Sequence, residues 1–250
     1  MAVELRQMTV TVGAPPAIAG REGRHVLADF YCALLGMEVI REDWLKIAKS
    51  ADAPFHLALD GDGWSDERPP RWGDPEHPQQ LHLDLVVGDV HAAGRLVEAM
   101  GGRLLQDGLT HRVYADPAGH PFCLYAEASA GDERGPGDVA RVVIDCFSPR
   151  HVSTFYEGLL QVARRIEDTP GRVVLALDDA RYPDFAFQHA VFLAPRWPDR
   201  AFPAQLHLDL RFGDGRDDAI ARAERLGGIR LPKLGDSEIF ADPAGHPFCL

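Results

Sequence analysis

The same ten residues, "ADPAGHPFCL", occur twice in this chain, at positions 115–124 and again at 241–250. Three further blocks recur in the same order: "FYCALLG" matches "FYEGLLQ", "PRW" occurs twice, and "QLHLDL" begins at Gln80 and again at Gln205, 125 residues later. A fixed internal period of this kind indicates repeated structural units and constrains the architecture more than any single motif does. We therefore predict a tandem duplication.

The stretch between the two copies has the composition of a linker. The segment "ASAGDERGPGD" is polar and rich in Gly and Pro, which is typical of a boundary between domains. We predict a first domain at 1–128, a linker at 129–137 and a second domain at 138–250.

Each half also contains a weaker internal repetition. "MTVTV" alternates as a strand does, and Val26, Phe30 and Leu34 follow with helical spacing up to Gly36. "LHLDLVV" is followed by a second helical pattern that begins after Asp89, a residue type that caps helix N-termini. Because the second half repeats this order, we predict four strand–helix–strand modules, two in each half.

The repeated decapeptide has the residues of a tight turn. In Asp-Pro-Ala-Gly, Asp bonds backbone groups of the turn, Pro fixes φ, and Gly tolerates the exit conformation. Strand-like segments stand on either side, so we predict the last hairpin of each half here, with His120 and His246 exposed to solvent. This interpretation explains Asp, Pro and Gly, but it does not explain Cys123 or Cys249.

Charge and composition exclude several classes of partner. The net charge of −12 disfavours nucleic acids and anionic membranes, which require a basic surface. The N-terminal residues lack the pattern of a signal peptide, no apolar run has membrane-spanning length, and the four cysteines show no CxxC spacing. We expect a cytoplasmic protein that recognises a small molecule. Its oligomeric state, a homodimer included, stays open.

Paired modules, "HLDL" at the start of the second module and a terminal "DPxGxxFCL" hairpin resemble the vicinal oxygen chelate superfamily, which includes glyoxalase I, extradiol dioxygenases and bleomycin-resistance proteins. "PRW" ahead of "HLDL" is similar to glyoxalase-like domains of the actinobacterial type. The resemblance covers residues 1–128 and 138–250. It implies an α+β fold of four βαβββ modules, in which each pair forms a U-shaped mixed sheet with helices outside and a cleft inside.

Strand alternation indicates which side chains face that cleft. In each "LHLDL" the leucines share one face, which must pack against helices, so His and Asp share the other. The same reasoning turns the Cys of "FCL" away from its Phe and Leu neighbours. The expected cleft residues are His82, Asp84, Cys123 and Tyr125 in the first half and His207, Asp209 and Cys249 in the second.

Aromatic residues near these strands are further ligand-binding candidates. Trp72 and Trp197 lie in Pro-rich loops just before the "HLDL" strands, where either a ligand-stacking lid or a structural plug over the cleft is expected. Phe187 and His189 are predicted to share the cleft face of a strand, with Gln188 on the other face.

The resemblance implies a divalent metal ion held by His, Gln and Glu side chains, but this chain departs from that pattern. The matching positions carry Gln7, His82 and Cys123 in the first half and Arg141, His207 and Cys249 in the second. The loss of the carboxylate removes a hard ligand, and an arginine repels a cation. We therefore expect no cofactor, with a metal ion on Gln7, His82 and Cys123 as the alternative.

Three classes of function remain open. The first, which we favour, is a protein that binds a small organic ligand without metal, because Arg141, His207 and Trp197 suit an anionic aromatic molecule. The second is a metal-dependent lyase or dioxygenase with a rearranged site. The third is a metal-free enzyme in which His82 or His207, oriented by the neighbouring Asp, acts as a general base.

Overall fold

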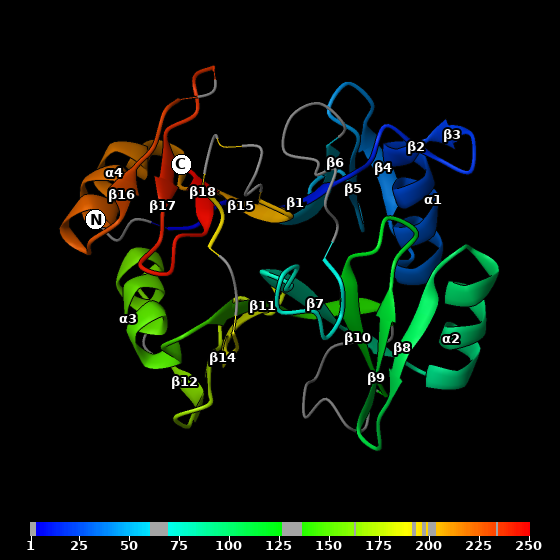
Figure 1. Cartoon of the computed structure of the whole chain (residues 1–250). Coiled ribbons are helices and arrows are strands. Elements are labelled where there is room, and N and C mark those ends of the chain that lie inside the picture. Colours follow the sequence, from blue (N-terminus) through cyan, green and yellow to red (C-terminus); the bar gives the residue numbers. More distant parts are fainter. Residues whose placement is uncertain are drawn as a thin grey trace.

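The computed structural model describes residues 4–60, 70–126, 137–162, 164–191, 194–196, 199, 204–233 and 235–250. Trp197 and almost all of the linker expected at 129–137 lie outside these residues. Within them the chain forms two eight-stranded mixed sheets, a two-stranded hairpin and four α-helices (Figure 1). The four-module α+β architecture is confirmed.

The strands of the two large sheets come from distant parts of the chain. Sheet 1 contains, in spatial order, β16 (Ile229–Arg230), β17 (Ile239–Ala241), β18 (Pro247–Cys249), β15 (Leu206–Arg211), β1 (Gln7–Gly13), β6 (Phe55–Asp60), β5 (Lys46–Ala48) and β4 (Glu38–Arg41). Sheet 2 contains β12 (Arg165–Asp168), β13 (Arg172–Leu175), β14 (Asp184–His189), β11 (Asp138–Cys146), β7 (Leu81–Val87), β10 (Pro121–Ala126), β9 (His111–Ala115) and β8 (Arg103–Asp107). The short strands β2 (Ala17–Ile18) and β3 (Arg21–Glu22) form the hairpin.

Each large sheet combines one module from each half of the chain. Sheet 1 joins the first module to the last through antiparallel pairing of β1 with β15, and sheet 2 joins the two middle modules through antiparallel pairing of β7 with β11. The expectation that each half forms a sheet of its own is therefore wrong. Alternation along a strand predicts which face a side chain occupies, but it does not identify the neighbouring strand.

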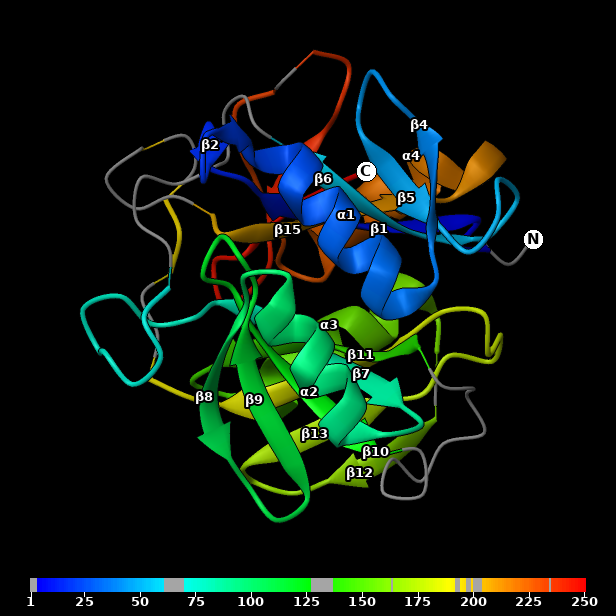
Figure 2. The same cartoon turned by 90° about the vertical axis from the view of Figure 1, so that its right-hand side faces the viewer.

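The helices cover the apolar faces of both sheets. They are α1 (Gly23–Leu35), α2 (Val90–Ala99), α3 (Pro149–Leu160) and α4 (Arg216–Arg225), the last preceded by the 3₁₀ turn η2 (Gly213–Gly215). Figure 2 shows α1 above α2 on one side of the molecule, and α3 contacts α4 on the other. The predicted helix stop at Gly36 and cap at Asp89 are confirmed, since Gly36 has φ +63° and the Asp89 carboxylate accepts two backbone N–H groups. No helix of the described residues is long and apolar enough to cross a bilayer.

The core lies between the two sheets. The leucines of β7 and those of β15 are buried in the same hydrophobic cluster, together with the apolar sides of the helices. His82 and Asp84 therefore lie on the opposite face of sheet 2, and His207 and Asp209 lie on the opposite face of sheet 1. We call these two surfaces the polar faces of the sheets.

The repeated decapeptide forms the last hairpin of each half, as predicted. In the first copy one oxygen of Asp116 accepts hydrogen bonds from the backbone N–H groups of Ala118 and His120, at 2.8 and 3.0 Å. The other oxygen accepts a hydrogen bond of 2.9 Å from the hydroxyl of Tyr31 on α1. The decapeptide thus fixes the turn and holds the helix of the preceding module.

The second copy repeats these contacts. Asp242 accepts from the backbone N–H groups of Ala244 and His246, and from the Tyr156 hydroxyl of α3 at 3.2 Å. The two repeated motifs, "FY" and "DPAG", are therefore partners in space. A buried carboxylate that accepts several hydrogen bonds stabilises the junction between two modules of one half.

The histidines of the decapeptide are buried, so the expected exposure to solvent is wrong. His120 is 4% exposed, and its Nε2 lies 2.7 Å from the backbone oxygen of Gly13 at the end of β1. His246 is 2% exposed and contacts Asp242 through Nδ1. The turn packs inside the molecule because it lies between modules.

A reciprocal contact joins the two sheets where their central strands begin. The backbone N–H of Gln80 donates to Oε1 of Gln205 at 3.1 Å, and the backbone N–H of Gln205 donates to Oε1 of Gln80 at 3.0 Å. The two "QLHLDL" segments therefore meet in equivalent environments. His82 and His207, two residues further on, occupy equivalent positions, as predicted.

The Tyr–Asp contacts give a testable prediction about stability. Tyr31→Phe leaves the buried Asp116 carboxylate without one donor and is expected to lower the free energy of unfolding by about 1.5–3 kcal/mol. Tyr156→Phe should have a similar effect. Tyr182→Phe removes a bond to the neutral backbone oxygen of Leu5 and should cost only about 0.5–1.5 kcal/mol. Urea unfolding measures all three, and equal losses in Tyr31→Phe and Tyr182→Phe would contradict the prediction.

Candidate functional site

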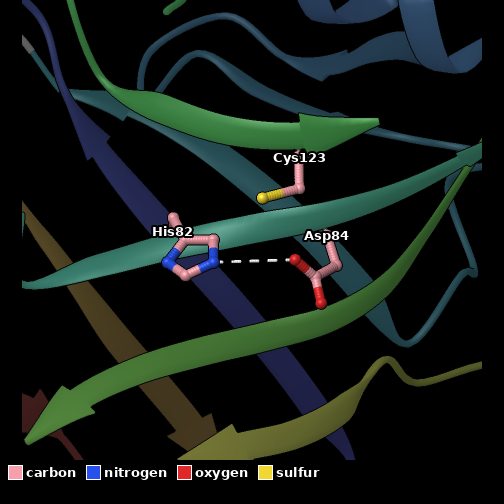
Figure 3. Close-up of side chains that lie close together, drawn as sticks. All are labelled: His82, Asp84 and Cys123. Carbon is pink, nitrogen blue, oxygen red and sulfur yellow. Dashed lines mark ion pairs between the residues drawn. The ribbon is translucent and has the colours of Figure 1, made fainter. Parts of the chain in front are cut away.

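Each polar face carries a cluster of one His, one Asp and one Cys. The β7 cluster consists of His82, Asp84 and Cys123, and the β15 cluster consists of His207, Asp209 and Cys249. In each cluster one ligand atom from each residue lies within 4.8 Å of the others. Figure 3 shows the β7 cluster, with His82 and Asp84 on one strand and Cys123 on the next.

Strand pairing places Asp84 at the centre of the β7 cluster. β10 runs parallel to β7 with Cys123 opposite Asp84, and β11 runs antiparallel on the other side with Arg141 opposite Asp84. Residues opposite one another on paired strands project from the same face. The predicted orientation of His82, Asp84, Cys123 and Tyr125 away from the helices agrees with this register.

Three basic side chains contact the Asp84 carboxylate. Arg172 and Arg141 approach Oδ2 at 3.2 and 3.5 Å, and the imidazole Nε2 of His82 lies 3.6 Å from Oδ1. Arg172 also donates to the side-chain oxygen of Gln188 at 3.3 Å. One buried carboxylate thus stands among two guanidinium groups and an imidazole.

These contacts shift the ionisation of the cluster. Burial disfavours the charged form of His82, but its contacts with Asp84 and Cys123 prevail and raise its pKa well above the usual value. Burial likewise opposes ionisation of Asp84, but His82, Arg172 and Arg141 lower its pKa. Burial raises the pKa of the Cys123 thiol, and His82 opposes that shift. Arg172 also pairs with Glu167 at 3.4 Å, and Arg141 lies opposite Asp184 on β14, so further carboxylates accompany the basic groups around Asp84.

An aromatic ring and an apolar patch flank the charged groups. The Arg141 guanidinium lies 5.9 Å from the ring centroid of Tyr125, and the His111 ring stacks on Tyr125 at a centroid distance of 4.9 Å. Val143, Val174 and Ala186 form a separate small hydrophobic cluster in sheet 2. Val143 lies opposite His82 in the register of β11 with β7, so the patch adjoins the cluster on the polar face.

Buried hydrogen-bond acceptors lie near His82. Asp145 is fully buried, and neither carboxylate oxygen has a hydrogen-bond partner. Burial raises its pKa, and the charge of the nearby His82 opposes that shift. The amide nitrogen of Gln79 contacts Nδ1 of His82 at 3.2 Å, and its amide oxygen has no partner. A bound molecule with hydroxyl or amino groups would satisfy these acceptors.

The β15 cluster has the same three residue types but different neighbours. The Thr11 hydroxyl donates to Asp209 at 2.9 Å, and the His207 imidazole lies 3.7 Å from that carboxylate. Burial lowers the pKa of His207 and strongly raises the pKa of the Cys249 thiol. Lys46, which is also buried, lies in the same sheet, and burial lowers its pKa. A hydroxyl thus contacts Asp209 where two guanidinium groups contact Asp84.

The two groups of metal-position residues expected from the sequence, one in each half, do not come together, because each is divided between the two sheets. Gln7 belongs to sheet 1, where its amide contacts His56 at 2.8 Å, so it does not join His82 and Cys123. Arg141 belongs to sheet 2, so it does not join His207. Both corrections have one cause, because each sheet combines modules from different halves.

Three of the candidates near the cleft strands, Phe187, His189 and Trp72, lie among the described residues. Phe187 is fully buried in the core, with its ring 5.4 Å from that of Tyr156, so the expectation that it faces a cleft is wrong. Its neighbour Gln188 faces the polar side and contacts Arg172 instead. His189 is exposed and contacts the backbone of Phe147, and Trp72 is 40% exposed.

Sequence reasoning missed Arg172, Asp145 and Gln188. β14 is buried along most of its length, so its pattern gives no sign of which face is polar. Arg172 lies on β13, a strand that the repeated blocks do not include. A basic residue that begins the apolar run "RVVLAL" was the available signal.

A pocket of about 380 Å³ lies away from both clusters. Lys49 lies between β5 and β6, Phe55 and Asp138 begin β6 and β11, and Tyr182 precedes β14, and all four line the pocket. Lys49 and Asp138 form an ion pair of 3.1 Å there. This pocket is a feature of the junction between the first and third modules.

Comparison with known proteins gives matches over nearly the whole chain. A family model described as a glyoxalase-like domain matches twice, at residues 20–125 and 141–250. Glyoxalase I from Zea mays has a similar structure, with a TM-score of 0.61 and 17% identity over 99% of this chain and 91% of that chain. A putative dioxygenase from Bacillus subtilis gives a TM-score of 0.62 and 12% identity, over 99% of this chain and 85% of that chain. No curated protein matches the chain.

The charges around Asp84 give a second prediction. Asp84→Asn leaves the surrounding basic groups without their central counter-charge and is expected to lower the free energy of unfolding by about 3–5 kcal/mol. The matched variant Asp209→Asn removes a carboxylate that accepts from a hydroxyl, and about 1–3 kcal/mol is expected. Urea unfolding at pH 7 compares the two variants, and equal losses would show that the arginines do not distinguish the clusters.

The pH dependence of stability gives a third prediction. The folded protein holds the His82 proton more tightly than the unfolded chain, so this stabilisation is complete below the unfolded pKa of about 6.5. It is lost as the pH rises through the folded pKa. In His82→Gln the contribution should disappear, which flattens the decline of stability above pH 6.5. An unchanged pH profile in His82→Gln would contradict the raised pKa.

Proposed function

Since the chain belongs to the family of glyoxalase-like domains, with one domain in each half, we propose that it binds a small organic anion on the polar face of sheet 2. The observation that carries this proposal is the convergence of Arg141, Arg172 and His82 on the single carboxylate of Asp84. The carboxylate of an anionic ligand would accept hydrogen bonds from these same donors.

Guanidinium groups suit this role because each presents several N–H donors in one plane. Arginine remains charged at any physiological pH and binds carboxylates and phosphates through paired hydrogen bonds. Arg141 and Arg172 come from β11 and β13, so they offer donors from two strands. Asp84 holds both guanidinium groups in place and so reduces the entropy lost when a ligand binds.

The neighbouring surface suits an apolar or aromatic ligand body. The patch of Val143, Val174 and Ala186 adjoins the basic groups, and the Tyr125 ring stands beside Arg141. Small-molecule sites typically combine such an apolar lining with a few placed polar groups. The ligand class that fits is a small aromatic or branched carboxylate or phenolate.

Benzoate and its neutral analogue benzamide test this proposal. Benzoate is expected to bind in isothermal titration calorimetry, and benzamide is expected to bind at least about tenfold more weakly because it lacks the charge. Arg141→Gln and Arg172→Gln should each weaken benzoate binding by about tenfold or more, since a hydrogen bond to a charged group contributes about 1.5–3 kcal/mol.

The matched control is Arg41→Gln, which removes an exposed guanidinium that pairs with Asp43 on sheet 1. Benzoate affinity should not change in this variant. If Arg141→Gln and Arg41→Gln bind benzoate equally well, or if benzamide competes as strongly as benzoate, the anion site is not where we place it.

A metal ion at the β15 cluster is the second candidate function, and the donor set favours it. His207, Asp209 and Cys249 provide nitrogen, oxygen and sulfur donors within 4.8 Å of one another, which suits a zinc-like ion with a water as fourth ligand. The thiol must lose its proton on binding, so binding would release protons. The β7 cluster does not fit a cation, because two guanidinium groups contact the Asp84 oxygen that a metal would need.

Cobalt(II) tests the metal candidate by absorption spectroscopy. A Co²⁺–thiolate bond gives a charge-transfer band in the near ultraviolet, and we expect this band on titration of the wild type. Cys249→Ala should lose the band, and Cys123→Ala should retain it. A band that survives in Cys249→Ala, or that Cys123→Ala removes, would rule out the β15 cluster as the metal site.

A further inference from the structure

We propose that Cys123 is the reacting group of the anion site on sheet 2, and that its thiol forms a covalent bond to the electrophilic carbon of a small bound organic anion. This proposal rests on the proposed anion binding. It adds covalent bond formation to the binding of the anion. It assigns this step to Cys123, in the first copy of the decapeptide, and not to Cys249 in the second.

The geometry places the sulfur beside the basic groups. In the row of paired residues across sheet 2, Arg141 and Cys123 flank Asp84 from opposite sides and share its face. The Cys123 sulfur lies within 4.8 Å of a ligand atom of both His82 and Asp84. An anion held by the guanidinium groups on one side of Asp84 would therefore bring its other end toward the sulfur.

His82 is the neighbour that favours the anionic form of the Cys123 sulfur. Thiolate, not thiol, is the nucleophile, and neighbouring cations stabilise it. Burial raises the pKa of the Cys123 thiol and Asp84 adds to that shift, whereas His82 opposes it. Binding of an electrophile next to the sulfur then converts an encounter in solution into a reaction between held groups.

The step balances without an additional reactant when the electrophile is a carbonyl carbon. The sulfur–carbon bond forms as the carbon–oxygen π bond opens, and the thiol proton ends on the carbonyl oxygen. His82, which lies beside the sulfur and holds a proton in the folded protein, can donate that proton to the carbonyl oxygen and then accept the thiol proton. No electrons leave the system, so no oxidant or metal is needed.

The second decapeptide provides an internal comparison. Cys249 has the same flanking residues as Cys123 and also lies beside a His–Asp pair. Its aspartate contacts the Thr11 hydroxyl instead of two guanidinium groups, and burial raises its thiol pKa strongly. If local sequence governed reactivity, the two cysteines would behave alike. If the arginines govern it, only Cys123 should select anionic reagents.

Alkylation by iodoacetate and iodoacetamide tests the proposal. The two reagents have similar size and the same leaving group, since sulfur displaces iodide from each, but only iodoacetate is anionic. Mass spectrometry of peptides follows the modification of Cys123 and Cys249 in the same molecule after treatment with EDTA. The rates for all four cysteines in urea give the intrinsic ratio of the two reagents.

The expected result is a selective enrichment at one cysteine. Relative to its ratio in urea, the iodoacetate-to-iodoacetamide rate ratio at Cys123 should rise by about tenfold or more, because the iodoacetate carboxylate can pair with the guanidinium groups and the iodoacetamide amide cannot. The ratio at Cys249 should not rise. Arg172→Gln should reduce the enrichment at Cys123, and Arg41→Gln should leave it unchanged.

Two results would overturn the proposal. One is a Cys123 that neither reagent modifies in the folded protein, and the other is equal ratios at Cys123 and Cys249. Benzoate titration of the same preparation separates this proposal from the proposed function. Normal benzoate binding with no enrichment refutes the reactive thiol alone, whereas loss of both refutes the anion site itself.

Discussion

The antiparallel pairing of β7 with β11 determines the chemistry of this molecule. It sets Arg141 directly opposite Asp84 and brings β13, with Arg172, onto the same sheet. Without it, Asp84 would remain beside His82 and Cys123 but without its guanidinium partners. The equivalent pairing of β1 with β15 instead gives Asp209 a threonine hydroxyl. The two clusters thus differ because of what the neighbouring strand supplies.

Much of the local structure could be predicted from the sequence. Alternation in "LHLDL" and "FCL" placed His82, Asp84 and Cys123 on one face, and the turn residues located both terminal hairpins. The family resemblance added the four-module α+β fold. The partner of each strand was not predictable, because four similar modules offer several pairings with the same pattern of faces. Gln7 and Arg141 were therefore assigned to the wrong clusters, and the doubly buried strand β14 misled the orientation of Phe187.

Duplication has preserved the structural contacts and changed the polar faces. Tyr31 with Asp116 and Tyr156 with Asp242 repeat the same hydrogen bond at the junction of two modules. On sheet 2 the row through His82 contains Val143 and Ala186, whereas on sheet 1 the row through His207 contains Thr11 and Lys46. The polar face of sheet 2 has apolar residues beside arginines, and the polar face of sheet 1 has a threonine beside a lysine, so the two faces favour different ligands. The repeated Tyr and Asp residues therefore hold the modules together, and the unrepeated neighbours distinguish the two repeated His–Asp–Cys clusters.

The shared sheets also have a consequence for synthesis of the protein. β1 pairs with β15, whose residues follow it by about 200 positions, so the first strand must wait for most of the chain to be translated. At about 5–20 residues per second, that delay is roughly 10–40 s. During this time β1 can pair with β6 on one side only, and its other edge is open to chaperones or to a second nascent chain. Sheet 1 is complete only after the fourth module has been translated and β15 pairs with β1.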